Sequence, residues 1–82
     1  KETWNVFPNP VTNGSLNLPT MGHNGNAITE VYDLTGRRWM QRSQNVAGMT
    51  QTAIDVSALP AGHYVVRMVT GETTRAAKFV VR

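Results

Sequence analysis

Turn-forming residues interrupt this sequence at short intervals, and their spacing constrains the fold more than any other feature. Short runs of β-branched and aromatic residues lie between these interruptions, which recur about every 8–12 positions. No stretch keeps apolar residues at the i, i+3, i+4 and i+7 positions that an amphipathic helix requires. The chain is therefore predicted to be all-β. Its 82 residues, without an internal repeat, make a single domain, with 1–4 as residual linker.

About seven short strands are predicted, spanning 5–7, 15–18, 27–33, 37–44, 50–56, 64–70 and 73–81. Pro8 and Pro10 end the first of them, because proline cannot donate a hydrogen bond to a strand ladder. Asp33 and Gly36 mark a tight turn, since aspartate side chains bond the backbone two residues on and glycine tolerates positive φ. Strands of this number and length predict a small immunoglobulin-like antiparallel β-sandwich.

The last two predicted strands allow the sharpest structural prediction. Gly71 followed by Glu72 fits a two-residue type II′ turn, which fixes the register of the hairpin. The predicted pairs are Tyr64 with Phe79, Val66 with Ala77, and Met68 with Arg75. Alternation directs Tyr64, Val66, Ala77, Phe79 and Val81 toward the core, and His63, Val65, Arg67, Ala76, Lys78, Val80 and Arg82 outward.

Apolar residues in the other predicted strands extend this core. Leu16, Leu18, Ile54, Val56 and Leu59 are expected to point inward. The strand 27–33 is ambiguous, because Ile28 and Val31 differ by three positions and cannot share a face without a bulge.

Composition excludes several classes of protein. The absence of cysteine rules out disulfides, cysteine-ligated zinc and cysteine nucleophiles. Charged residues make up only 16%, which argues against a coiled coil or a disordered tail. His23 and His63 lie in different elements without a carboxylate at ligand spacing, so no metal, cofactor or catalytic triad is predicted. The chain is not expected to be an enzyme. It is not expected to insert into a membrane either, because no apolar run approaches the ~20 residues needed.

The net charge of +3 is the first indication of a partner. The basic residues fall into two groups, Arg37, Arg38 and Arg42 in one, and Arg67, Arg75, Lys78 and Arg82 in the other, with Lys1 apart. Nucleic-acid binders carry denser basic stripes and a recognisable motif, so an acidic or anionic partner other than nucleic acid is favoured.

Aromatic residues give a second, weaker indication. Trp4, Trp39, Tyr32 and Tyr64 could form a stacking platform, but core packing is the better interpretation in so small a domain. An exposed cation–π cluster of Trp39 with its neighbouring arginines stays open.

Four segments together are similar to one known family. They are Val6-Phe7-Pro8-Asn9-Pro10 followed by Asn13-Gly14, Val31-Tyr32-Asp33-Leu34-Thr35-Gly36-Arg37, the stretch from Asp55 to Arg67 that contains Leu59-Pro60-Ala61-Gly62-His63-Tyr64, and the terminal Lys78-Phe79-Val80-Val81-Arg82. In this order, and over essentially the whole chain, they resemble the type A C-terminal sorting domain of the type IX (Por) secretion system.

The resemblance implies a non-catalytic secretion signal. Cargo proteins of Gram-negative bacteria carrying such a domain enter the periplasm, and the type IX translocon passes them across the outer membrane. The cargo then lies on the cell surface or is secreted. In many members a cell-surface sortase removes the domain and joins the cargo to anionic lipopolysaccharide. The implied partners are translocon and sortase proteins.

The residues that the resemblance assigns to recognition are Pro8, Asn9, Pro10, Gly14, Asp33, Gly36, Gly62, Tyr64, Arg67, Lys78, Phe79, Val80, Val81 and Arg82. Two departures from the family pattern are an extra residue near Glu30 and a long loop over 21–26. As the last strand, 73–81 is expected to present an edge that a partner reads, and a free edge would also allow weak dimerisation.

Two other functions are weighed against this one. An immunoglobulin- or fibronectin-like module that binds carbohydrate or a surface protein would need Trp4 and Trp39 exposed and coplanar. A small enzyme would need His23 or His63 beside a carboxylate in a cleft.

Overall fold

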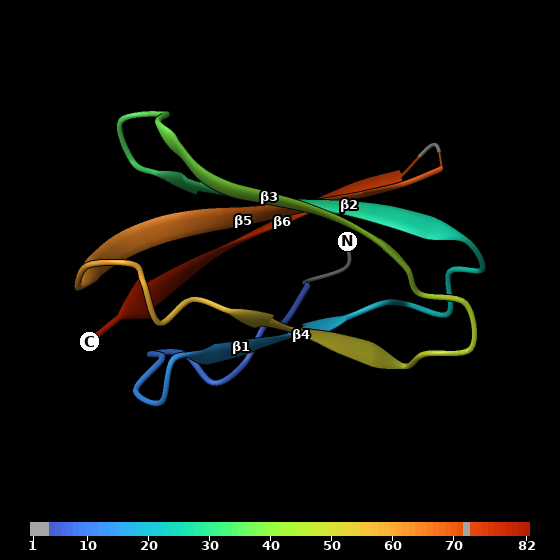
Figure 1. Ribbon diagram of the computed structural model, residues 1–82, viewed down its shortest axis with the longest axis horizontal. Helices are drawn as coiled ribbons and strands as arrows, with labels where there is room; N and C mark the ends of the chain where they lie inside the picture. The colour runs from blue at the N-terminus through green and yellow to red at the C-terminus, as the bar shows by residue number, and fades with distance from the viewer. Residues whose placement is uncertain (1–3, 72) are drawn as a thin grey trace.

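Two antiparallel sheets face one another in the computed structural model, which describes residues 4–71 and 73–82 (Figure 1). The smaller sheet pairs β1 (Ser15–Pro19) with β4 (Gln51–Asp55). The larger has the order β3-β2-β5-β6, formed by β2 (Asn26–Asp33), β3 (Arg38–Asn45), β5 (Gly62–Thr70) and β6 (Thr73–Val81). This arrangement confirms the predicted small all-β sandwich.

The number of strands is six in the described ranges, rather than the seven predicted. The segment predicted as a strand over 5–7 makes only an isolated bridge, between Phe7 and Asn17. Pro8 and Pro10 follow at once, and neither has an N–H with which to extend the pairing.

The predicted register of the last hairpin is confirmed. Tyr64 pairs with Phe79, Val66 with Ala77 and Met68 with Arg75. The prediction of a type II′ turn involves Glu72, which lies outside the described residues. The aromatic rings of Tyr64 and Phe79 stack in the core with centroids 5.7 Å apart, and the ring of Trp39 meets Tyr64 edge-on.

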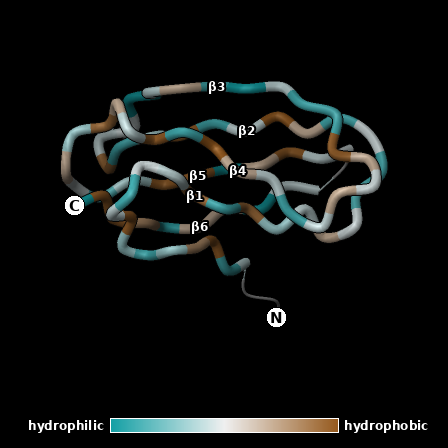
Figure 2. Tube along the Cα trace, turned by 60° about the horizontal axis from the view of Figure 1, so that its bottom comes forward, coloured by the Kyte–Doolittle hydropathy of each residue, from teal (hydrophilic) through white to brown (hydrophobic). Residues whose placement is uncertain are grey.

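The core lies between the two sheets and follows the predicted alternation. Its fully buried side chains include Leu16, Leu18 and Ile54 from the smaller sheet and Val31, Val66 and Phe79 from the larger. Val56 and Leu59, which follow β4, are buried as predicted. Figure 2 shows apolar, brown residues interspersed with polar, teal ones along the tube. Buried residues alternate with more exposed ones in β4 and in β5 from Tyr64 to Met68, so these strands have one inward and one outward face.

The ambiguity in β2 is resolved by placing its two apolar residues on opposite faces. Val31 is fully buried, whereas Ile28 is 39% exposed. A bulge does occur, but after Val31: Val31 pairs with Met40 and Tyr32 with Arg38, which leaves Trp39 as the extra residue.

Different contacts connect the two sheets at each edge of the sandwich. On one side, residues 4–11 (the N-terminal segment) connect β1 to β6. The Val11 N–H donates to the carbonyl of Val80 over 2.7 Å, and the Arg82 N–H donates to the carbonyl of Val11 over 3.0 Å. On the other side Arg42 of β3 reaches β4, where its guanidinium donates to the carbonyl of Ala53 over 3.0 Å. The terminal strand is therefore the edge of its sheet, but its last residues are covered.

Candidate recognition surface

The larger sheet turns one face away from the smaller sheet, and this outer face carries most of the described basic side chains of the last two strands. Arg67 of β5 and Lys78 of β6 point outward, opposite in phase to the buried Val66 and Phe79. Arg38 of β3 is on the same face, and the exposed Arg82 follows β6 directly. The outward orientation predicted for the last hairpin is thereby confirmed.

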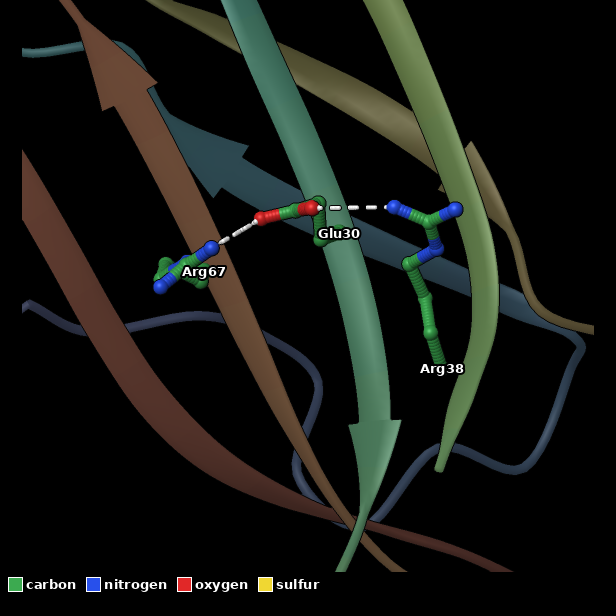
Figure 3. A network of polar contacts seen from close by, with 3 residues as sticks. All are labelled: Glu30, Arg38 and Arg67. Atoms are coloured by element: carbon green, nitrogen blue, oxygen red, sulfur yellow. Dashed lines mark hydrogen bonds and ion pairs between the residues drawn. The ribbon is translucent and has the colours of Figure 1, made fainter. Parts of the chain in front are cut away.

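A carboxylate at the centre of this face holds two of the arginines (Figure 3). Glu30 of β2 lies opposite Arg67 in the register, and its Oε1 accepts bonds from Arg67 Nε over 3.0 Å and Nη2 over 2.5 Å. Its Oε2 accepts a longer bond, 3.4 Å, from Arg38 Nη1. The bonds from Arg67 hold the pKa of the Glu30 carboxyl below its ordinary value and raise that of Arg67. Both groups therefore stay charged at neutral pH.

The outer face keeps an excess of positive charge despite this pairing. The Glu30 side chain is 9% exposed, whereas those of Arg38 and Arg67 are 51% and 45% exposed. An arginine has more N–H donors than these bonds use, so both guanidiniums can still bind an anion. Exposed Lys78 and Arg82 add two further cations. Among the residues that the structure places on this face, Glu30 is the one acid, so the surface favours an acidic partner.

The N-terminal and C-terminal motifs of the sequence meet at the edge of β6. The Asn9 side chain behaves like a strand residue: its Nδ2 donates to the Lys78 carbonyl over 3.3 Å, and its Oδ1 accepts from the Val80 N–H over 3.0 Å. Pro8 and Pro10 flank it. Three of the predicted recognition residues, Asn9, Lys78 and Val80, are thus bonded together although the two motifs are about 70 positions apart.

The central turn motif is structural. Asp33 Oδ1 accepts bonds from the Thr35 N–H, the Thr35 hydroxyl and the Arg37 N–H, and its Oδ2 accepts from the Trp39 indole. Gly36 has φ of +90°, which a side chain would strain. The Thr35 hydroxyl, followed by Trp39, contributes most to lowering the pKa of Asp33 from an ordinary 3.8 to about 2.

This shifted pKa predicts a pH-dependent stability. Because the folded-state pKa of Asp33 is depressed, its ionised form stabilises the fold fully above pH ~4, and this contribution is lost as the pH falls toward ~2. Asp33→Asn is expected to lower the melting temperature at neutral pH and to flatten its decline between those two pH values. Thermal melts of both proteins from pH 7 to 2 check this, and parallel curves would contradict it.

Gly14 serves the packing of the loop before β1 against the end of β4. Its φ is +78°, its carbonyl accepts the Val56 N–H, and a Cβ at this position would lie 2.9 Å from Cβ of Ser57. Both the backbone conformation and the lack of space therefore require glycine.

Gly14→Ala is expected to destabilise the domain by about 2–4 kcal/mol, from roughly 1 kcal/mol of backbone strain and the remainder from overpacking. Gly48→Ala is the matched control, because Gly48 has the same φ of +78° with no heavy atom within 4 Å of the added Cβ. Its expected cost is the strain alone. Urea unfolding measures both, and equal losses would show that the contact with Ser57 costs nothing.

The tyrosine of the Gly-x-Tyr motif is part of the core. Tyr64 is 4% exposed, and its hydroxyl donates to the Pro60 carbonyl over 2.5 Å, an arrangement like the tyrosine corner of immunoglobulin-type sandwiches. Gly62 begins β5 just before it. Phe79 and Val81 are also buried, so these motif residues support the surface from within.

The aromatic side chains do not form an exposed platform. Trp4 is 7% exposed, and its indole donates to the Pro19 carbonyl over 3.0 Å. Trp39 packs partly into the core, and the Arg37 guanidinium lies 4.5 Å from its ring centroid. The cation–π contact is therefore present, but Trp4 does not meet the condition set for a carbohydrate platform.

No group of three or more His, Asp or Glu side chains among the described residues is placed to hold a metal ion. The same residues contain no helix long and apolar enough to cross a membrane.

Together the fold and the surface define a small β-sandwich domain with its terminal strand at a sheet edge and a basic outer face. Residues 5–82 match the family described as "Secretion system C-terminal sorting domain", whereas a search of curated proteins gives no match. The chain belongs to this family, the C-terminal sorting domains of type IX secretion. It is a sorting signal of a non-catalytic family, interacts with the type IX machinery, and directs export to the cell surface or secretion. The resemblance drawn from the sequence is confirmed.

Proposed function

We propose that the domain forms the C-terminal end of a cargo protein and is read in the periplasm by the type IX translocon. The reading surface is the basic outer face of the larger sheet together with β6. The excess of cations around Glu30, continued by Lys78 and Arg82, is the observation that supports it. Acidic side chains on the translocon protein would complement this surface and orient the cargo.

The buried motif residues have an indirect part in this proposal. Phe79 and Val81 anchor β6 in the core, and Asn9 holds its end. They keep the cations of the strand at fixed positions, so their loss would disturb recognition through the fold.

Sortase processing belongs to the same proposal. A sortase would cut the chain upstream of the sandwich and transfer the cargo to anionic lipopolysaccharide. Trp4 is buried and bonded to Pro19, which supports treating the whole chain from Trp4 onward as one domain. We place the linker that is cut before Trp4.

The proposal is tested by fusing the domain to a periplasmic reporter in cells with and without a type IX translocon. The reporter is expected outside the outer membrane only when both domain and translocon are present. Covalent lipopolysaccharide on the exported reporter would identify the sortase route, and its absence would contradict that part. Export that persists without the translocon, or a folded fusion that stays in the periplasm with it, would overturn the proposal.

A further inference from the structure

In the first half of β6, some backbone N–H and carbonyl groups point away from β5, toward the open edge of the sheet. Farther along the strand the Lys78 carbonyl, the Val80 N–H and the Arg82 N–H all face the N-terminal segment. Because strand residues alternate, the N–H and carbonyl groups of Thr74 and Ala76 face the same side. Outside the strand ladders, none of the backbone–backbone hydrogen bonds within residues 4–71 and 73–82 involves Thr74 or Ala76.

A groove of about 460 Å³ runs beside this open part of the strand. Trp4, Asn5, Val6 and Asn9 form one wall, and Ala76, Ala77 and Lys78 form the other. The two alanines have short side chains, so the strand backbone is accessible from the groove. The N-terminal segment thus closes the end of β6 and leaves a slot beside its middle.

We propose that this groove binds an extended acidic peptide segment, which adds to β6 as a further antiparallel strand. Main-chain bonds to Thr74 and Ala76 would supply affinity, and alternate side chains would contact Trp4 and Val6. The open stretch from Thr74 to Ala76 accommodates about three residues of such a segment, and Asn9, bonded to the Lys78 carbonyl, limits it at the other end. This acidic segment would belong to a protein of the type IX secretion machinery, an assignment that rests on the proposed function.

Charge complementarity decides which occupant the groove favours. Among the described residues that line the groove, Lys78 has the one charged side chain, and the neighbouring outer face is basic as well. A second copy of this domain would bring a second net charge of +3 against the first, and like net charges oppose association. An acidic segment meets no such repulsion.

The probe for this inference is a fluorescent heptapeptide in which valine alternates with aspartate, titrated into the complete isotope-labelled domain. The amide resonances of Thr74 and Ala76 are expected to shift on binding. Replacing the aspartates by lysine removes the charge attraction to Lys78, and N-methylating alternate residues removes the main-chain hydrogen bonds to β6. Each change is expected to weaken binding at least about tenfold.

Two protein variants make the test specific to the groove. Ala76→Pro removes an N–H that faces away from β5, which an edge strand tolerates, and is expected to weaken binding by about tenfold. Lys78→Gln is expected to weaken it about threefold and to reduce its salt dependence. Undiminished binding of the N-methylated peptide, or no binding of the acidic one, would overturn the inference, as would concentration-dependent self-association that shifts the same amides.

The inference and the proposed function fail in different experiments. Normal translocon-dependent export combined with absent peptide binding would refute the groove and leave the sorting function standing. Peptide binding by a domain that is not exported would support the groove and contradict the proposed function.

Discussion

Phe79→Ala is expected to destabilise the domain by about 3–5 kcal/mol, the usual cost of removing a fully buried aromatic ring. Phe79 has no exposed surface, and its ring stacks on Tyr64 with centroids 5.7 Å apart. An 82-residue domain has a total stability of roughly 4–12 kcal/mol. The substitution therefore removes a large fraction of that stability, and the melting temperature should fall by more than about 10 °C.

Val80→Ala is the matched control, because Val80 is the next residue of β6 and faces outward, where it is only half-buried. Its expected cost is about 1 kcal/mol or less. Urea unfolding followed by the fluorescence of the buried Trp4 measures both variants. A larger loss for Val80→Ala would mean that the alternation of β6 is reversed.

The last hairpin could be predicted from the sequence because its determinants are local. A two-residue turn sets the register, and alternation then assigns each side chain to a face. The same logic placed Leu16, Leu18 and Ile54 inward, and the structure confirms it. The prediction of a strand over 5–7 is wrong: this segment makes a single bridge, because the two prolines that follow have no N–H with which to extend the pairing.

The Glu30 cluster could not be predicted, because it depends on pairing between distant strands. Glu30 occupies an outward position in β2, where a charged residue normally contacts solvent. Its burial arises because β3 and β5 flank β2 and place Arg38 and Arg67 on either side. A basic residue in each neighbouring predicted strand was the available signal, but strand order was not known.

The closure of the β6 edge was also missed, for a similar reason. Proline-rich Pro8-Asn9-Pro10 reads as a turn, and nothing local shows that the Asn9 amide will pair with Lys78 and Val80. The recognition residues assigned by resemblance therefore fall into two physical groups. Tyr64, Phe79 and Val81 are buried supports, whereas Arg67, Lys78 and Arg82 are exposed.

Reversing the charges of two exposed residues, Lys78 and Arg82, is expected to have the largest effect on function. Lys78→Glu combined with Arg82→Glu should leave the melting temperature within a few degrees of wild type, since surface substitutions usually change stability by about 0.5 kcal/mol or less. Each reversal places like charges against an acidic partner and is expected to weaken its binding about tenfold. Export of a fused reporter should then fall by about a hundredfold, or to background.

This design separates recognition from folding, which deletion of 78–82 would not do. The deletion also removes the core residues Phe79 and Val81 and the partners of Asn9, so it would abolish export by unfolding the domain. The control for net charge is Gln51→Glu with Ala53→Glu, which changes the charge by the same amount as Lys78→Glu alone but on exposed positions of β4 in the other sheet. If this control lost as much export as Lys78→Glu, the translocon would be sensing overall charge. If the doubly reversed variant stayed folded and was exported normally, recognition would have to lie on another face of the sandwich.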